Sequence, residues 1–195
     1  MYQTRIKPIQ SALEPGKVYR RRDLTGLSSN LDRYLPKLVE KGVLRKITRG
    51  LYVCPMNTVF GEALPDEQQL LKTFLRDEHF VVFSLSVFNS LGLGTTQLYN
   101  QRIVVNRKRH GEFILGDRKY FFHRRLEVPT PKQVTREYFV MELLNRLNDL
   151  AENQQAVLKH LKEKLPDFDQ KKLLYAKKHY ATYSAQLKFD KIYAA

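Results

Sequence analysis

The sequence predicts an α+β fold with two domains and a helical C-terminal tail, and three observations lead to this prediction. Residues 18–55 combine a run of apolar residues at helical spacing with a β-rich hairpin. Residues 80–123 contain short runs of β-branched and aromatic residues, and from Thr135 onward the apolar residues recur at helical spacing. Residues 55–66 hold two prolines and a glycine and predict a connector, so the domains are expected at residues 1–56 and 66–195.

The first elements of the chain are short. Thr4–Leu13 predicts a helix that the pair Pro15-Gly16 ends. Val18-Tyr19 predicts an extended piece, and Arg20–Thr25 predicts a basic helix of one or two turns that Gly26 ends. A short helix followed by a glycine turn is the first half of a helix-turn-helix unit.

A second helix is expected to begin after Ser28 or Ser29, because a serine hydroxyl at this position accepts a hydrogen bond from a free backbone N–H. At about 100° per residue, its core face holds Leu31, Leu35, Leu38 and Val39. A separate face is polar and basic, and it holds Asn30, Arg33, Lys37 and Lys41. Pro36 lies inside this helix and removes one backbone hydrogen bond, so either a kink or an irregular first turn is expected.

Gly42 ends this helix, and a hairpin follows in which Val43–Thr48 and Leu51–Cys54 are the strands and Arg49-Gly50 is the turn. The order of two helices and a basic hairpin is that of a winged helix-turn-helix, which places its second helix in the major groove of DNA. The candidate DNA-binding residues are Arg20, Arg21, Arg22, Ser28, Ser29, Asn30, Arg33, Tyr34, Lys37, Arg45, Lys46, Thr48 and Arg49. The alternative interpretation of the polar helix face is an ordinary solvated surface.

The charge distribution favours a polyanionic partner. The chain carries 34 Lys and Arg against 20 Asp and Glu, a net charge of +14. Residues 1–54 hold 12 basic and 4 acidic residues, a net charge of +8 on about a quarter of the chain. Such an excess attracts phosphates through counterion release. The alternative is a basic protein whose positive charge serves only its solubility.

The second domain is expected to contain a helix that Asp66 caps, a strand entering a buried helix over Phe80–Leu91, a strand at Arg102–Asn106 and a hairpin over Glu112–His123. Helices are expected over Thr135–Asn153 and Gln154–Lys164, and a last one after Asp169. A second basic surface is predicted on this domain, formed by Arg107, Lys108, Arg109, Arg118, Lys119, Arg124 and Arg125. It is interpreted as a second nucleic-acid surface, as a docking face for an acidic protein, or as solvent-facing strand residues.

Enzyme-type motifs are not found in the sequence, and no metal or cofactor is predicted. None of the histidines has metal-ligand spacing, and the Leu91–Gly94 segment lacks the lysine of a phosphate loop. Cys54 is the only cysteine, so it can form neither an intramolecular disulfide nor a cysteine-rich zinc site. Apolar runs are too short for a membrane span and the N-terminus has no signal-peptide core, so a cytoplasmic location is expected.

Four stretches resemble a known family. The segment KVYRRRDLTGLSSNLDRYLPKLVEKGVLRKITRGLYVCP, with its Arg-Gly-Leu-Tyr hairpin, is similar to the winged-helix domain of AbiEi-type antitoxins and related transcriptional regulators of type IV toxin–antitoxin systems. VFSLSVFNSLGLGTTQ with GDRKYFFHRR resembles their second domain, and LLYAKKHYA their C-terminal end. Pro36 departs from the uninterrupted helix of that family.

The resemblance implies a function. It implies a DNA-binding autorepressor that binds double-stranded DNA at its own promoter, with a second domain that neutralises a nucleotidyltransferase toxin. A stand-alone regulator, or a winged-helix module that binds protein instead of DNA, would have the same sequence pattern.

Overall fold

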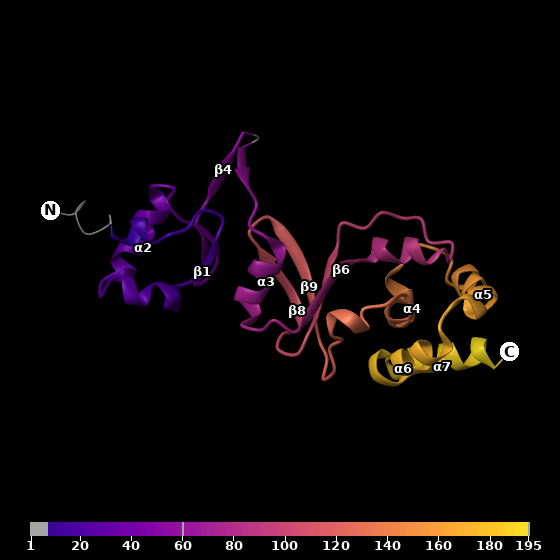
Figure 1. Cartoon of the computed structure of the whole chain (residues 1–195). Helices are drawn as coiled ribbons and strands as arrows, with labels where there is room; N and C mark the ends of the chain where they lie inside the picture. Colours follow the sequence, from indigo (N-terminus) through magenta and orange to yellow (C-terminus); the bar gives the residue numbers. More distant parts are fainter. Residues whose placement is uncertain (1–7, 60, 195) are drawn as a thin grey trace. The chain divides into compact units, whose positions relative to one another are not determined.

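The computed structural model describes residues 8–59 and 61–194, and the chain forms two compact units (Figure 1). The N-terminal unit extends to Glu78 and includes Ile114–Arg118. The C-terminal unit consists of His79–Phe113 and the chain from Lys119 onward. Both contain helices and strands, which confirms the predicted α+β class.

The N-terminal unit is built around a small antiparallel sheet with the strand order β1-β3-β2. Residues 8–11 are helical, and the expected beginning of this helix at residues 4–7 lies outside the described residues. The elements that follow are β1 (Val18–Arg20), the 3₁₀ helix η1 (Arg21–Leu27), α2 (Leu31–Glu40), β2 (Arg45–Thr48), β3 (Leu51–Val53), β4 (Met56–Thr58), β5 (Gly61–Ala63) and α3 (Glu67–Leu75).

Helix α2 packs into the core of this unit by the face that the apolar spacing predicts. Leu31, Leu35 and Leu38 are buried there with Leu24 of η1 and Leu44. The helix runs through Pro36, whose ring lies on the exposed side of the helix. Its start differs from the prediction. Neither serine caps it: Asn30 is the N-cap residue, and the Ser28 hydroxyl accepts a hydrogen bond from the Asn30 amide at 3.2 Å.

The predicted connector is in part a hairpin, β4–β5, that sequence reasoning missed. Its turn is closed by the Thr58 hydroxyl, which donates to the Gly61 carbonyl at 2.8 Å. Gly61 has a φ of +107°, which a glycine adopts without strain. The pairing covers three residues on each strand, too few for an alternating pattern to be visible in the sequence.

Helix α3 begins after Asp66 as predicted, with the Asp66 carboxylate accepting from the Gln69 amide at 2.7 Å. The predicted division of the chain assigned this helix to the second domain, whereas in the structure it packs in the N-terminal unit. The Gln69 side chain accepts from the Val18 amide at 3.0 Å, and the Arg20 guanidinium donates to the carbonyls of Thr73 and Phe74. These bonds join α3 to β1, and no local sequence pattern reports them.

The C-terminal unit combines a sheet with a helical tail. From His79 onward the elements are β6 (Phe80–Ser84), η2 (Leu85–Leu91), β7 (Arg102–Asn106), β8 (Gly111–Leu115), β9 (Arg118–Arg124), η3 (Pro131–Gln133), α4 (Arg136–Asn145), η4 (Leu147–Asp149), α5 (Gln154–Lys164), η5 (Leu165–Asp167), α6 (Gln170–Tyr180) and α7 (Tyr183–Tyr193). Residues Ile114–Arg118, at the turn between β8 and β9, are counted with the N-terminal unit. The sheet order is β6-β7-β9-β8, with β6 antiparallel and β9 parallel to β7. Residues of β6, β7, η2 and the helices share one apolar core.

The helical tail confirms the prediction in part. The helix expected over residues 135–153 ends at Asn145, and a separate 3₁₀ turn follows. Helix α7 was missed, although Thr182 is an N-cap residue whose hydroxyl accepts from the Ala185 amide at 3.3 Å. Among the described residues, no helix is long and apolar enough to cross a membrane.

Candidate nucleic-acid interface

The polar face of α2 is on the surface of the N-terminal unit. Asn30 and Arg33 are exposed and Lys37 is half-buried, while the opposite face of the helix is in the core. Arg33 and Lys37 are four residues apart and therefore project on the same side. Asn30 makes no side-chain cap hydrogen bond to the helix. The structure thus brings these side chains together at the beginning and middle of α2.

Tyr34 was predicted to reach DNA, and the structure contradicts this prediction. Its side chain is only 4% exposed and packs in the core with Leu24, Leu31 and Leu38. The spacing explains the error: Tyr34 is three residues from Leu31 and four from Leu38, so it belongs to the apolar face. A residue buried in this core packs the helix and does not present a group to a ligand.

The three arginines at the junction of β1 and η1 have different surroundings. Arg20 donates to the carbonyls at the end of α3, as described above. Arg21 forms a two-bond ion pair with Asp32 of α2, and this hydrogen bonding holds the pKa of the Asp32 carboxyl below its usual range. Arg22 lies 3.6 Å from the carboxylate of Asp23, with both side chains exposed. Arg20 is thus a structural residue, and the charges of Arg21 and Arg22 are partly balanced by acids.

The tip of the β2–β3 hairpin is exposed and basic. Arg49 is exposed, and Gly50 follows with a φ of +72°, a conformation that favours glycine. The Gly50 carbonyl accepts from the Arg21 amide at 2.9 Å, which ties the tip to the start of η1. Thr48 is half-buried beside the tip, and Ser29 is exposed in the turn before α2.

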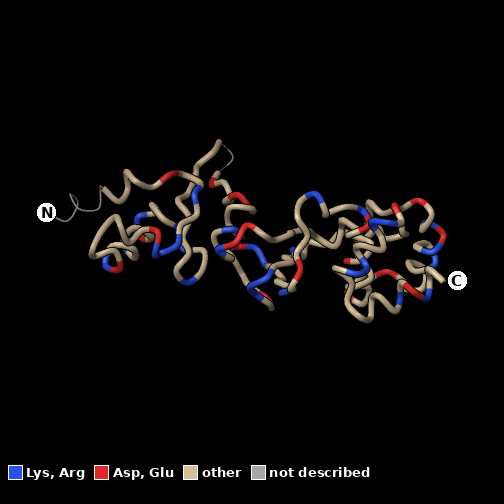
Figure 2. The backbone as a smooth tube through the Cα atoms, turned by 60° about the horizontal axis from the view of Figure 1, so that its bottom comes forward, with Lys and Arg blue, Asp and Glu red and all other residues tan. Residues whose placement is uncertain are grey.

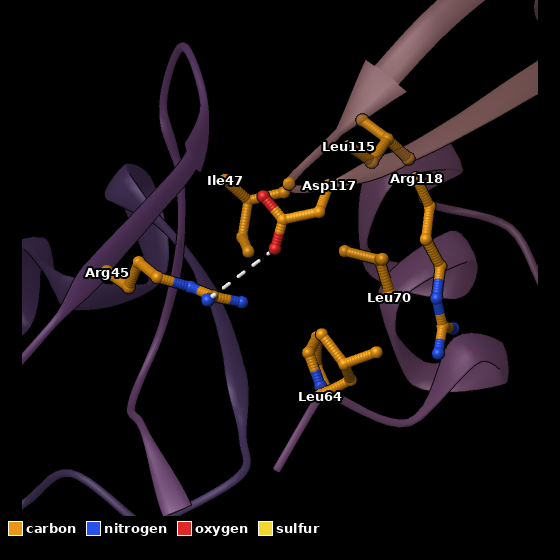
Figure 3. A pocket seen from close by; sticks show the side chains of 9 residues that line it. Arg45, Ile47, Leu64, Leu70, Leu115, Asp117 and Arg118 are labelled. Carbon is orange, nitrogen blue, oxygen red and sulfur yellow. Dashed lines mark ion pairs between the residues drawn. The ribbon is translucent and has the colours of Figure 1, made fainter. Parts of the chain in front are cut away.

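Arg45 and Lys46 are neighbours on β2 and therefore point to opposite faces of the strand. Lys46 is exposed. Arg45 lies 3.2 Å from Glu62 and 3.8 Å from Asp117, at the edge of a cavity of about 10 Å³ that Ile47, Leu70 and Leu115 also line (Figure 3). Arg45 is therefore engaged with acids inside the N-terminal unit, and its prediction as a DNA contact has no support from its geometry.

The second basic surface predicted from the sequence is not one continuous patch. Arg118 belongs to the N-terminal unit, where it lies 3.8 Å from Glu67. Lys119 pairs with Glu112 at 2.9 Å across the β8–β9 hairpin, and Arg125 pairs with Glu142. The remaining members, Arg107, Lys108, Arg109 and Arg124, are exposed at the ends of β7 and β9. Figure 2 shows that basic residues occur in both units and that acidic residues are interspersed among them along the chain.

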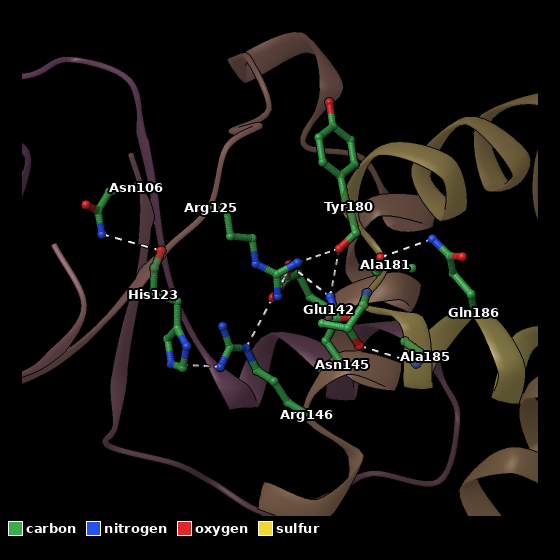
Figure 4. A network of polar contacts seen from close by, with 11 residues as sticks. Asn106, His123, Arg125, Glu142, Asn145, Arg146, Tyr180, Ala181, Ala185 and Gln186 are labelled. Atoms are coloured by element: carbon green, nitrogen blue, oxygen red, sulfur yellow. Dashed lines mark hydrogen bonds and ion pairs between the residues drawn. The ribbon is translucent and has the colours of Figure 1, made fainter. Parts of the chain in front are cut away.

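A buried ionic network lies beside these strand ends, and sequence reasoning missed it (Figure 4). Glu142 of α4 is fully buried and lies 3.2 Å from Arg146, which is 3% exposed, and 3.5 Å from Arg125. Arg125 and Asn145 both donate to the Tyr180 carbonyl at the end of α6. The i,i+4 spacing of Glu142 and Arg146 is the one sequence signal that points to this pair.

The network holds two buried polar atoms for which the described part of the chain offers no partner, Nη2 of Arg146 and the hydroxyl of Tyr138. Burial raises the pKa of the Tyr138 phenol above its ordinary value, so the phenol is neutral throughout the physiological range. A small buried water is the usual partner of such atoms. The network therefore joins α4, the end of α6 and the residue that follows β9.

His123 of β9 is joined to this network and is expected to make stability depend on pH. Its Nε2 lies 3.0 Å from Nη1 of Arg146, which can only donate, so His123 accepts and is neutral. Burial, together with the charges of Arg146 and Arg125 and the neighbouring His110, lowers the pKa of His123 from 6.5 to about 4.

The unfolded chain takes up a proton at His123 below pH 6.5, whereas the folded chain resists it down to about pH 4. The contribution of His123 to stability therefore falls as the pH is lowered through this window. We expect urea unfolding between pH 7.5 and pH 4 to show a smaller loss of stability in His123→Gln than in the wild type. Parallel stability curves for the two proteins would contradict this assignment. Because carboxylates titrate in both proteins, the difference between the curves is the measurement.

Within residues 8–59 and 61–194, no group of three or more His, Cys, Asp or Glu side chains is placed to hold a metal ion. Cys54 is buried in the core of the N-terminal unit, and burial raises the pKa of its thiol. A thiol with a raised pKa is a poor nucleophile.

Comparison with known proteins gives a similarity of fold. No protein-family model and no curated protein matches the chain. Among solved structures, the chain is similar to the RV2827C protein from Mycobacterium tuberculosis, with a TM-score of 0.58 and 16% sequence identity. The alignment covers 97% of this chain and 76% of that chain. At this identity the similarity extends to the fold alone.

Proposed function

We propose that this protein is a DNA-binding transcriptional regulator whose N-terminal unit is a winged helix-turn-helix. The observation that carries the proposal is the arrangement around α2. The helix buries one face in the core and exposes Asn30 and Arg33, and the basic β2–β3 hairpin follows it as the wing. In winged-helix domains the second helix enters the major groove and the wing contacts the backbone or the minor groove.

The roles of the residues follow from their chemistry. The Asn30 amide suits the edge of adenine and the Arg33 guanidinium that of guanine, while Arg49 at the wing tip suits a phosphate. Lys37 and Lys46 add positive charge beside them. Arg20 and Arg45 bind carbonyls and carboxylates within the unit, so they are left out of the proposed interface.

The proposed target is the promoter of the protein's own gene, and the proposed role is autorepression. This part rests on the resemblance to AbiEi-type antitoxins. That resemblance also suggests a nucleotidyltransferase toxin as partner of the C-terminal unit. A nucleotidyltransferase gene directly downstream, whose toxicity is relieved by co-expression of this protein, is the expected finding. If the toxicity persists on co-expression, the proposed toxin partner is ruled out and the proposal is reduced to a stand-alone regulator.

DNA binding is tested by fluorescence anisotropy with the DNA upstream of the gene and with a scrambled duplex. Asn30→Ala is expected to reduce the preference for the promoter by about 1–3 kcal/mol. Arg49→Ala is expected to weaken binding to both duplexes. It should also reduce the slope of log affinity against log salt concentration by about one.

The matched control is Lys178→Ala, which removes the same charge from an exposed position on α6. Two results would sink the proposal. One is a wild-type protein that binds the promoter no better than the scrambled duplex. The other is an Arg49→Ala variant that behaves like Lys178→Ala.

A further inference from the structure

One arginine, Arg21, is bonded to both parts of the proposed DNA-binding surface. Its backbone amide donates to the Gly50 carbonyl at the wing tip at 2.9 Å. Its guanidinium donates twice to the carboxylate of Asp32 on α2, from Nε to Oδ1 at 2.6 Å and from Nη2 to Oδ2. Because Arg21 is also the first residue of η1, this one residue joins η1, α2 and the wing.

The backbone at Arg21 is held by the residue that precedes it. Arg20 is opposite Leu51 in the register of β1 and β3, and its amide donates to the Asp23 carboxylate at 3.0 Å. These contacts fix the point at which η1 leaves the sheet. The Arg21 guanidinium therefore extends from a fixed position, and a planar two-bond contact restricts both the distance and the orientation of the carboxylate that it binds.

Asp32 lies in the first turn of α2, at the end of the helix that carries Asn30. Core packing holds α2 by its buried leucines, whereas Asp32 is on the exposed side of the helix. The pair with Arg21 therefore ties the exposed side of this first turn to the residue that also binds the wing. In helix-turn-helix units, the first residues of the second helix are those that contact base edges.

The Arg21–Asp32 pair is exposed, so stability is not its main contribution. The two side chains are 48% and 67% exposed, and ion pairs at such positions add little to the free energy of unfolding. A two-bond pair still fixes geometry. It also neutralises an acid on the helix that is proposed to face DNA, where an unpaired carboxylate would repel phosphates.

We propose that Arg21 is a positioning residue: by binding Asp32 and Gly50, it sets the position of the first turn of α2 relative to the wing. This inference rests on the proposed winged helix. A phosphate contact by Arg21 and a positioning role predict opposite effects for the loss of Asp32. If Arg21 bound phosphate, removing Asp32 would free its charge and strengthen binding to every duplex. If Arg21 positions α2, removing Asp32 weakens the preference for the promoter.

The test measures the affinity of full-chain variants for the promoter duplex and the scrambled duplex by fluorescence anisotropy at one salt concentration. Asp32→Ala removes the pair. Its matched control is Glu40→Ala, which removes the same charge from an exposed position at the other end of α2. Arg21→Lys keeps the charge but not the two-bond contact, and its matched control is Arg22→Lys at the neighbouring exposed arginine. Thermal melting checks that each variant is folded.

Asp32→Ala and Arg21→Lys are each expected to lower the preference for the promoter duplex about 5- to 10-fold, with melting temperatures close to that of the wild type. The double variant should lose no more than either single variant, because all three lack the same pair. Both controls should keep the wild-type preference.

Other outcomes overturn the proposal. An Asp32→Ala variant that binds both duplexes more tightly and keeps its preference assigns Arg21 to a phosphate. Equal weakening on both duplexes with a lowered melting temperature assigns the pair to stability alone. A wild type without any preference removes the winged-helix proposal and this inference with it. A wild-type preference that both Asp32→Ala and Arg21→Lys retain removes this inference alone.

Discussion

Replacing Glu142 by glutamine is expected to lower the free energy of unfolding by about 3–5 kcal/mol. Glu142 is fully buried and is the carboxylate that both Arg146 and Arg125 contact. Without the charge of Glu142, the buried Arg146 loses the carboxylate that it contacts among the described residues. Urea unfolding followed by circular dichroism measures the loss.

Two control variants test whether the loss of stability arises because the charge of Glu142 is buried. Asp190→Asn breaks the ion pair with Lys177, in which the Asp190 side chain is 53% exposed, and should cost about 1 kcal/mol or less. The double variant Glu142→Met with Arg146→Met removes both buried charges and should be more stable than Glu142→Gln. A loss in Glu142→Gln no larger than that in Asp190→Asn would contradict the role of the network.

Replacing Tyr34 by alanine is expected to cost about 3–5 kcal/mol of stability, because the side chain fills the core between α2 and η1. Tyr34→Phe keeps the ring and removes only the hydroxyl. It should stay within about 1 kcal/mol of the wild type and should retain the DNA affinity of the wild type. Thermal unfolding and anisotropy measure the two properties.

The comparison between the two variants distinguishes packing from contact with DNA. A contact through the hydroxyl would make Tyr34→Phe lose affinity while its stability stays unchanged, and that outcome would restore the role that the sequence suggested. A packing role predicts that Tyr34→Ala loses stability and that Tyr34→Phe loses neither property.

Much of the fold was readable from local patterns. The strand Arg102–Asn106 and the helix Gln154–Lys164 have the predicted bounds, because alternation and helical spacing are carried by neighbouring residues. The start of α3 followed from Asp66 for the same reason, since a cap bonds within its own first turn. The short β4–β5 hairpin and α7 were missed, the first because its strands are too short to show a period.

The candidate site was less predictable, because a charged residue type does not show which partner it meets. Arg20, Arg21 and Arg22 are adjacent and look alike in the sequence. In the structure they meet the end of α3, Asp32 and Asp23, respectively. The carbonyls that Arg20 meets lie 53 and 54 residues further along the chain, so only folding decides that Arg20 is structural.

By itself, the sequence determined the α+β class, most helix and strand positions and the basic character of the chain, since these depend on composition and on the spacing of neighbours. The tertiary structure alone decided that α3 joins the N-terminal unit and that Glu142 meets Arg125. These features depend on contacts between residues that are distant in sequence or on the burial that packing creates, and neither is encoded in a local pattern.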